Sequence, residues 1–145
     1  SEMCIRDRPY THTVQYYETD KMGITHHSNY IRWMEEARVD FLAQMGWDYA
    51  KLESLGIVSP VTAVDCKYMI STTFAEKITI TVSIAEFKVV RLKLAYTMKN
   101  TEGKVVCQAH SEHCFLDTSG NLIRLKKDFP EFYEALCGYA GSAPA

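Results

Sequence analysis

The residues best suited to chemistry lie in one segment, residues 17–30, where Asp20 and Gly23 precede His26 and His27. This turn has no periodicity and is followed by apolar residues at helical spacing, so a helix is expected to start just after it. A helix N-terminus carries unpaired N–H groups and a partial positive charge, which can bind the oxygen of a polarised carbonyl. With the Asp20 carboxylate on the other side of that carbonyl, the arrangement predicts acyl transfer.

Thioesters suit a site with one carboxylate, because a thiolate leaves without strong protonation. Asp20 would attack the carbonyl carbon itself or activate a water. The spacing alone leaves a second interpretation open, in which Asp20 caps its own turn. Ser28 is interpreted as the helix N-cap, and a triad of Ser28, His27 and Asp20 is rejected because adjacent residues point apart.

A strand and a helix are expected to hold this turn. In residues 10–18, Val14 and Tyr16 alternate with polar neighbours, which predicts a strand. The helix that follows is the strongest in the sequence and stops at Gly46. Its apolar stripe comprises Tyr30, Trp33, Met34, Ala37, Phe41 and Met45, whereas Arg32, Glu35, Glu36 and Asp40 fall outside it.

The remaining chain predicts mainly strands, separated by turns rich in Gly, Asn and Asp. Pro60 is expected to interrupt the first of these strands or to place it at a sheet edge. The elements are a short helix at 48–55 closed by Gly56, strands at 57–69, 78–84, 90–98 and 105–116, and a last amphipathic helix at 130–136 whose Phe132, Tyr133 and Leu136 can cover open surface.

Short turns between strands imply antiparallel neighbours, so these elements predict an α+β domain in which the main helix buries one face of a single sheet. Such a sheet leaves unpaired backbone groups at its edges. Pairing with a second copy of the chain is a common way to cover them, so a homo-oligomer is expected.

The composition is that of one domain of 145 residues. Residues 10–137 are taken as this domain, 1–9 as a leader outside the fold and 138–145 as a flexible tail. The 16 basic and 18 acidic residues are scattered, which argues against a nucleic-acid partner. No apolar run approaches the roughly 18 residues of a membrane span, and the five cysteines form no disulfide or zinc pattern, so a cytoplasmic protein is expected.

The motif resembles a known family. The pattern Tyr17-x-x-Asp20-x-x-Gly23-Ile24-x-x-His27-x-x-Tyr30, followed by Arg32-Trp33-x-Glu35-Glu36-Ala37-Arg38, is similar to the hotdog-fold acyl-CoA thioesterases that include 4-hydroxybenzoyl-CoA thioesterase. The ending His113-x-Phe115-x-Asp117-x-x-Gly120 is similar to that family too. The resemblance covers residues 10–133.

The resemblance implies a hotdog fold, in which a five-stranded antiparallel sheet wraps around one long central helix. It also implies a homodimer or homotetramer with its active sites between subunits. It carries over Asp20 as the catalytic carboxylate, with Gly23 and with His27 at the position of the oxyanion-donating N–H. Residues expected to contact substrate are Tyr17, Ile24, His26, Asn29 and Tyr30, with Lys88 and Arg91 as candidates for the CoA phosphates.

Two other groups of residues have the types that catalysis or metal binding needs. A sister branch of the hotdog thioesterases has its carboxylate on the central helix, nine residues after a His, which here is Glu36. On a helical wheel Glu36 lies at the flank of the apolar stripe, so it ranks second to Asp20. The run Cys107, His110, His113 and Cys114 is rejected as a metal site, because on a strand the same-side pair is separated by roughly 13 Å.

The sequence therefore predicts hydrolysis of an acyl-CoA, or of an acyl carrier protein thioester, without a metal or other cofactor. One rival is a hotdog hydratase or dehydratase acting on 3-hydroxyacyl thioesters, in which His27 would be the base. The other is a non-catalytic acyl-CoA-binding module.

Overall fold

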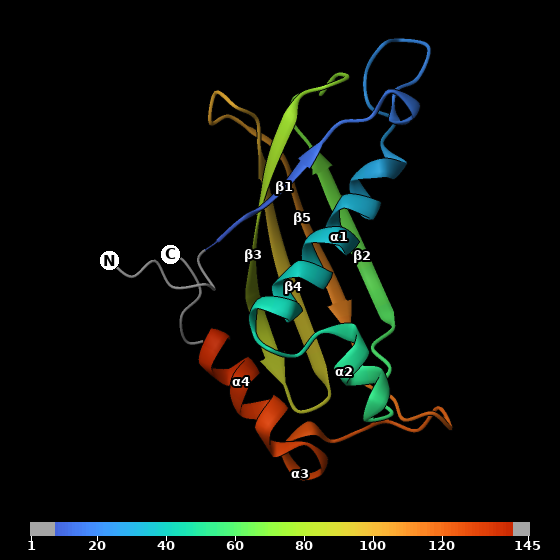
Figure 1. Cartoon of the computed structure of the whole chain (residues 1–145), viewed down its shortest axis with the longest axis vertical. Coiled ribbons are helices and arrows are strands. Elements are labelled where there is room, and N and C mark those ends of the chain that lie inside the picture. Colours follow the sequence, from blue (N-terminus) through green and yellow to red (C-terminus); the bar gives the residue numbers. More distant parts are fainter. Residues whose placement is uncertain (1–7, 141–145) are drawn as a thin grey trace.

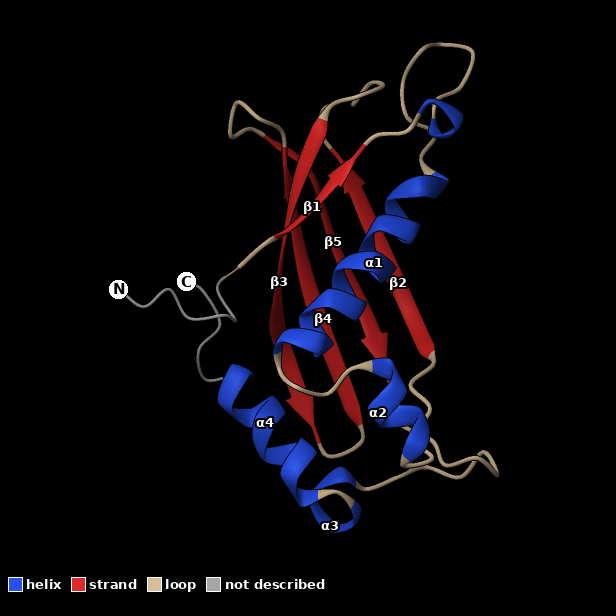
Figure 2. Ribbon diagram, in the orientation of Figure 1, coloured by secondary structure: helices blue, strands red, loops and turns tan. Residues whose placement is uncertain are grey.

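The computed structural model describes residues 8–140, which form one antiparallel sheet with helices against it (Figure 1). The strand order is β1-β3-β4-β5-β2, and every neighbouring pair is antiparallel. Figure 2 shows the long helix α1 lying across one face of this sheet. The strands are β1 (Tyr10–Thr13), β2 (Val61–Tyr68), β3 (Lys77–Lys88), β4 (Arg91–Lys99) and β5 (Val105–His113). The helices are η2 (Tyr16–Glu18, a 3-10 turn), α1 (Ser28–Gln44), α2 (Tyr49–Ser54), α3 (Leu125–Asp128) and α4 (Pro130–Ala140).

The core lies between α1 and the sheet. The predicted stripe of α1 is confirmed, because Tyr30, Trp33, Met34, Ala37 and Phe41 are buried and Met45 packs against them. From the sheet, the inward residues of β3 and β4 meet this stripe at period two. They are Ile78, Ile80, Ile84, Leu92, Leu94, Tyr96 and Met98. The predicted α+β arrangement is therefore confirmed.

The predicted strand at 10–18 is wrong beyond Thr13. The chain leaves the sheet there and closes the 3-10 turn η2, which leaves Tyr16 and Tyr17 on the surface and buries Glu18. The alternation of Val14 and Tyr16 predicted a strand that the structure does not have. The chain turns there because buried hydrogen-bond donors bind the Glu18 carboxylate inside the core. These donors come from other elements, so local spacing does not reveal them.

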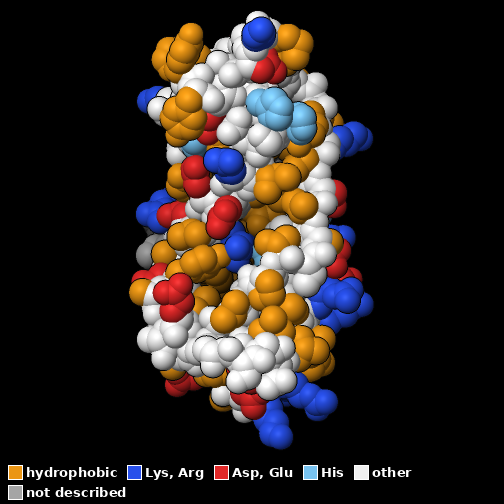
Figure 3. Space-filling model, turned by 90° about the vertical axis from the view of Figure 1, so that its right-hand side faces the viewer, with side chains coloured by type: hydrophobic (Ala, Val, Ile, Leu, Met, Phe, Trp, Pro, Cys, Tyr) orange, Lys and Arg blue, Asp and Glu red, His pale blue; other side chains and the backbone are white. Residues whose placement is uncertain are grey.

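Strand β2 is an open edge of the sheet. The strand predicted at 57–69 begins only at Val61, just after Pro60, and β2 lies at an edge of the sheet as expected, pairing with β5 alone. Seven of its eight residues are exposed, among them Val61, Val64 and Tyr68. Figure 3, which views the molecule from this side, shows apolar side chains gathered in a band along this face, with histidines above it. The edge strand therefore presents both unpaired backbone and apolar surface to the solvent.

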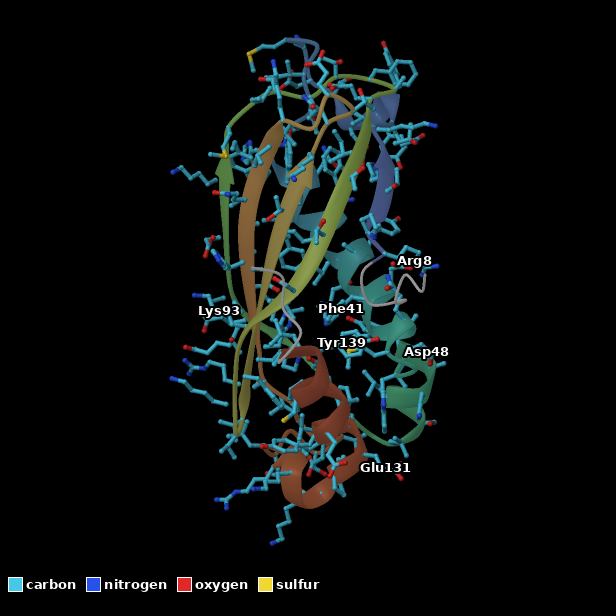
Figure 4. All side chains as sticks on the ribbon, turned by 90° about the vertical axis from the view of Figure 1, so that its left-hand side faces the viewer. Arg8, Phe41, Asp48, Lys93, Glu131 and Tyr139 are labelled. Carbon is cyan, nitrogen blue, oxygen red and sulfur yellow. The ribbon has the colours of Figure 1, made fainter. Side chains whose placement is uncertain are left out.

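Helix α4 closes the far end of the core. Phe132 and Leu136 are fully buried, and the Phe132 ring stacks on Trp47 with ring centroids 4.8 Å apart. The expected tail is wrong for Gly138–Ala140, because α4 continues to Ala140. The reason is an edge-to-face contact of the Tyr139 ring with Phe41, 5.5 Å between centroids, which Figure 4 shows.

The structure describes the two ends of the chain only in part. At the N-terminal end, Arg8 lies beside α1, where its carbonyl accepts a hydrogen bond from Gln44 and its guanidinium lies 3.5 Å from Asp40. Residues 1–7 and 141–145, which hold most of the expected leader and tail, lie outside the described residues. Within residues 8–140, no helix has the length and hydrophobicity needed to span a membrane.

Candidate active site

Asp20 lies in a tight turn between η2 and α1. Its Oδ1 accepts a hydrogen bond from the Met22 N–H at 2.8 Å, and its carbonyl accepts one from the Gly23 N–H at 2.9 Å. Gly23 has φ +81°, a conformation that favours glycine. The capping interpretation is thus correct for one carboxylate oxygen. Oδ2 accepts no hydrogen bond from any described residue and remains available for chemistry.

The start of α1 supplies the N–H groups that the sequence predicted. His27 holds the N-cap position, and its side chain makes no capping bond, so the prediction that Ser28 is the N-cap is wrong. The His26 ring takes over that role, since its Nδ1 accepts the Ser28 N–H at 3.2 Å. The N–H of Asn29 is bonded to the His26 carbonyl, but that of His27 donates to no described residue. The His27 N–H is therefore available to a ligand.

Asp20 and this helix start open into the same cavity, of about 260 Å³. The cavity is bounded by the turn and α1 on one side and by the end of β2 and the loop after it on the other. Its lining residues are Asp20, Met22, Ile24, Thr25, His27, Tyr30, Tyr68, Met69, Ile70 and Ser71. The structure thus brings together Asp20, Ile24, His27 and Tyr30 of the predicted set.

The wall behind the cavity is held by buried hydroxyl groups. The Tyr30 hydroxyl shares a hydrogen bond with Thr72 Oγ1 at 2.9 Å, and Thr72 Oγ1 lies 2.6 Å from Thr25 Oγ1. The Thr25 N–H also donates to the Thr72 carbonyl at 2.9 Å. Burial raises the pKa of Tyr30, so its phenol stays neutral at neutral pH and serves to position the helix start.

The other predicted residues lie outside this cavity. Tyr17 is 81% exposed on the surface of η2, and Gly23 and His26 are exposed beside the turn. Asn29 has a structural role instead, because its side-chain amide donates to the Glu18 carbonyl at 3.0 Å.

Lys88 and Arg91 belong to the turn between β3 and β4, at the opposite end of the sheet from the β1–β3 pairing that precedes Asp20 (Figure 1). Each has an acidic neighbour, Glu86 at 3.9 Å and Glu112 at 3.7 Å respectively. Within one chain, neither basic residue reaches the cavity.

Tyr68 is a site residue that sequence reasoning missed. Its hydroxyl donates to the His27 carbonyl at 3.2 Å, and its ring lies 5.0 Å from that of Tyr30 and 6.2 Å from that of His27. No local signal marks it, because it is a single tyrosine at the end of a strand. Only the pairing of β2 with β5 places that strand end beside α1.

Glu18 was missed as well, although it is two residues from Asp20. Its side chain is buried, and three donors bind its carboxylate: His12 Nε2 at 2.9 Å, Trp33 Nε1 at 2.9 Å and the Gln15 N–H at 2.8 Å. Burial alone would raise the pKa of Glu18, but these hydrogen bonds outweigh it and lower the pKa. A buried ionised carboxylate with a full set of donors fixes the start of the catalytic turn.

The network extends to Glu36, on the other side of His12. His12 Nδ1 lies 2.9 Å from Glu36 Oε1, which also accepts a hydrogen bond from the Tyr10 hydroxyl at 2.8 Å. The His12 ring therefore bridges the two carboxylates of Glu18 and Glu36. Glu36 does not line the Asp20 cavity, in keeping with its second rank as a catalytic candidate.

The backbone of Glu18 connects this network to the catalytic residues. Its carbonyl accepts hydrogen bonds from the His26 N–H at 2.8 Å and from the Asn29 side chain at 3.0 Å. The Glu18 side chain is anchored in the core, while its main chain holds the segment that begins α1. Displacement of Glu18 would therefore move both sides of the cavity.

Comparisons with known proteins agree with this reading of the fold. A family described as the thioesterase-like superfamily matches residues 14–136. The DHNA-CoA thioesterase of Staphylococcus aureus is 31% identical, with a TM-score of 0.86 over 90% of this chain and 89% of that one. A structure of a hypothetical protein from Aquifex aeolicus is 30% identical, with a TM-score of 0.82 over 88% of this chain and 98% of its own.

Two curated relatives are similar in sequence. A Bacillus subtilis protein, named as a candidate acyl-CoA thioesterase, is 31% identical over 84% of this chain and 89% of its own length. The 1,4-dihydroxy-2-naphthoyl-CoA hydrolase of Thermosynechococcus vestitus is 29% identical over 75% of each protein. With the sheet and central helix in the expected order, the hotdog fold is confirmed. The chain belongs to the thioesterase-like superfamily.

Proposed function

We propose that this protein hydrolyses acyl-CoA thioesters, with Asp20 as nucleophile or general base and the His27 N–H as oxyanion donor. The observation that carries the proposal is the shared cavity. Asp20, in the turn before α1, and His27, at the start of α1, both line it. Asp20 Oδ2 and the His27 N–H are both without partners among the described residues. The relatives named for CoA thioester hydrolysis support the same chemistry.

The geometry serves two routes to the same products. In the first, Asp20 Oδ2 attacks the thioester carbon, the thiolate of CoA leaves, and water hydrolyses the resulting mixed anhydride. In the second, Asp20 takes a proton from a water that attacks the same carbon. In both routes the carbonyl oxygen gains negative charge, which the His27 N–H and the positive end of α1 stabilise. Neither route needs a metal or redox cofactor.

The thioester bond of an acyl carrier protein would present the same reacting group. CoA is the better match, since the relatives are named for CoA substrates. Lys88 and Arg91 remain candidates for the CoA phosphates. Because they lie far from Asp20 in their own chain, they would serve the cavity of a second copy.

A thiol-release assay tests the function directly. We expect the protein to release CoA thiol from at least one member of a panel of short, medium and aromatic acyl-CoAs, detected with a thiol reagent. A hydratase or dehydratase acting on a 3-hydroxyacyl-CoA would change absorbance at the acyl group without releasing thiol. A binding module would retain labelled acyl-CoA unchanged. Either of these results, without free thiol, would contradict the proposal.

We further propose that two copies associate through β2. The exposed edge, with Val61, Val64 and Tyr68 on its surface, fits a second β2 running antiparallel to it. Sedimentation equilibrium should then give at least twice the 16.6 kDa of one chain. Val64→Lys should shift the mass toward that of a monomer. Val89→Lys, in the exposed β3–β4 turn, is the matched control and should leave the mass unchanged. A monomeric parent protein would exclude this assembly.

A further inference from the structure

Thr72, in the loop between β2 and β3, is a fully buried threonine that bonds to both halves of the candidate active site. This loop and the turn that holds Asp20 lie at the same end of the sheet (Figure 1). Thr25 and Tyr30, whose hydroxyl groups lie within hydrogen-bond distance of Thr72 Oγ1, are buried as well. All three side chains are enclosed within one chain, so the cluster stays closed whether or not a second copy covers β2.

One set of bonds from Thr72 holds the hairpin that carries Asp20. Thr19 and Thr25 face each other in an antiparallel bridge. Within that hairpin, the Asp20 N–H donates to the Ile24 carbonyl at 2.9 Å. Thr25 donates its N–H to the Thr72 carbonyl at 2.9 Å, and its Oγ1 lies 2.6 Å from Thr72 Oγ1. A shift of Thr72 would therefore move the hairpin to which Asp20 belongs.

Another bond from Thr72 holds the start of α1. Thr72 Oγ1 lies 2.9 Å from the hydroxyl of Tyr30, in the first turn of the helix. Thr25 and Tyr30 flank His27 in the sequence, so the chain is tied to one hydroxyl group on both sides of the His27 N–H. A hydroxyl group donates one hydrogen bond and can accept others, which lets Thr72 Oγ1 keep both partners at once.

These bonds restrain the separation between the two reacting sides of the cavity. Asp20 Oδ2 and the His27 N–H must meet the same thioester carbonyl, and a misplacement of about 1 Å in such an arrangement can lower the rate about 100-fold. Thr72 itself does not line the cavity, whereas Thr25 and Tyr30 do. Any effect of Thr72 on the reaction must therefore pass through these two neighbours.

We propose that Thr72 is a positioning residue for thioester hydrolysis, whose hydroxyl group keeps the Asp20 hairpin and the start of α1 at the separation that the reaction needs. This inference rests on the proposed function. Valine has nearly the shape of threonine but no hydroxyl group. In Thr72→Val the Tyr30 hydroxyl loses its bond to the loop, and Thr25 Oγ1 loses the shorter of its two bonds to Thr72.

Two substitutions of Thr72 test the role of its hydroxyl group. Thr72→Val should lower kcat about tenfold and change KM by less than about threefold, because the reacting groups are misaligned while the lining of the cavity is unchanged. Thr72→Ser keeps the hydroxyl and should hold kcat within about threefold of the parent value. Thiol release from an acyl-CoA that the parent protein hydrolyses is the assay.

The outcomes separate this inference from the proposed function. A parental kcat in Thr72→Val would overturn the positioning role and leave the proposed function intact. A kcat in Thr72→Ser as low as that of Thr72→Val would also overturn it, because the hydroxyl group would then not be the cause. Absence of hydrolysis by the parent protein with every acyl-CoA would refute the proposed function, and this inference with it.

Ser111→Ala is the matched control for the loss of a buried hydroxyl group. Ser111 is buried on β5, where its Oγ lies 2.7 Å from the Tyr96 hydroxyl and 2.7 Å from His113 Nε2, and it lines no part of the Asp20 cavity. Ser111→Ala and Thr72→Val should both lower Tm by several degrees, but only Thr72→Val should lower kcat. Equal losses of kcat well below Tm would show that Thr72 contributes stability alone.

A double-mutant cycle with Tyr30→Phe identifies the route of the effect. Tyr30→Phe removes the hydroxyl group through which Thr72 holds α1. It should lower kcat about fivefold in the parent protein and less than about twofold in Thr72→Val, where the bond is already absent. The same factor in both backgrounds would contradict an action of Thr72 through the start of α1.

Hydrogen exchange provides a measurement that needs no turnover. The N–H groups of Asp20 and Thr25 are bonded within and behind the hairpin, and NMR can follow both. They should exchange about tenfold faster in Thr72→Val than in the parent protein, and at the parental rate in Ser111→Ala. Thr25→Val removes the partner hydroxyl instead and should also speed exchange of the Asp20 N–H, so it serves if Thr72→Val does not fold. Parental exchange of Asp20 in the folded variant would overturn the proposal.

Discussion

Asp20→Asn should lower kcat for acyl-CoA hydrolysis by about 10²- to 10⁴-fold, the range expected when a catalytic acid–base group is lost. An amide oxygen can still accept the Met22 N–H that Asp20 Oδ1 binds, so the turn should keep its geometry. What disappears is the basic and nucleophilic oxygen that faces the cavity. Steady-state kinetics by thiol release, together with the Tm of parent and variant, provide the measurement.

Asp117→Asn is the matched control for this change. Asp117 accepts the N–H groups of Ser119 and Asn121 through the same kind of turn, but it lies on the loop between β5 and α3 and lines no part of the Asp20 cavity. The kcat of Asp117→Asn should remain within about twofold of the parent value. If Asp20→Asn retained parental turnover with an unchanged Tm, Asp20 could be neither nucleophile nor base.

Labelling with heavy-oxygen water separates the nucleophilic route from the general-base route. The parent protein is taken through a single turnover in H₂¹⁸O and then digested with a protease. In the nucleophilic route, water that attacks the aspartyl carbon of the anhydride leaves label in the peptide that contains Asp20. In the general-base route the label appears only in the released acid. Label in the Asp20 peptide would establish the nucleophilic route, whereas label confined to the acid would exclude attack of water at the aspartyl carbon; Asp20→Asn provides the unlabelled control.

Glu18→Gln should cause the largest loss of stability among near-isosteric changes around the site, about 3 kcal/mol or more in the free energy of unfolding. The carboxylate accepts hydrogen bonds from His12, Trp33 and the Gln15 N–H, and an amide must turn its NH₂ group toward at least one of these donors. The loss also leaves the buried His12 with a weaker partner. Urea unfolding at pH 7 measures the change.

Activity should fall as well, because the Glu18 carbonyl holds the start of α1. A shift of the Asp20 turn relative to the His27 N–H should lower kcat about tenfold or more at a temperature well below Tm, with a smaller change in KM. Glu36→Gln is the control in the same network. The Glu36 side chain is 39% exposed and does not contact the catalytic turn. We therefore expect Glu36→Gln to lower the free energy of unfolding by about 1 kcal/mol or less and to keep the parental kcat. Equal kcat values in the two variants would show that Glu18 has no positioning role.

Local spacing was sufficient for most of the fold. The apolar stripe from Tyr30 to Met45 predicts α1, and alternating residues predict β3 and β4, because side-chain periods of 3.6 and 2 are properties of the backbone itself. Pro60 correctly indicates an edge strand, since proline cannot donate a ladder hydrogen bond. The short helix α3 was missed because four residues are too few to show a helical period.

Contacts between distant segments decided the rest. The sequence by itself determined that Asp20 lies in a turn just ahead of a helix, because Gly23 and the apolar run after it are local signals. Only the tertiary structure decided what faces that turn: Tyr68 arrives through the pairing of β2 with β5, and Glu18 is buried through donors on β1 and α1. Local periodicity assigns a residue to a face, whereas the order of strands in the sheet determines which faces meet.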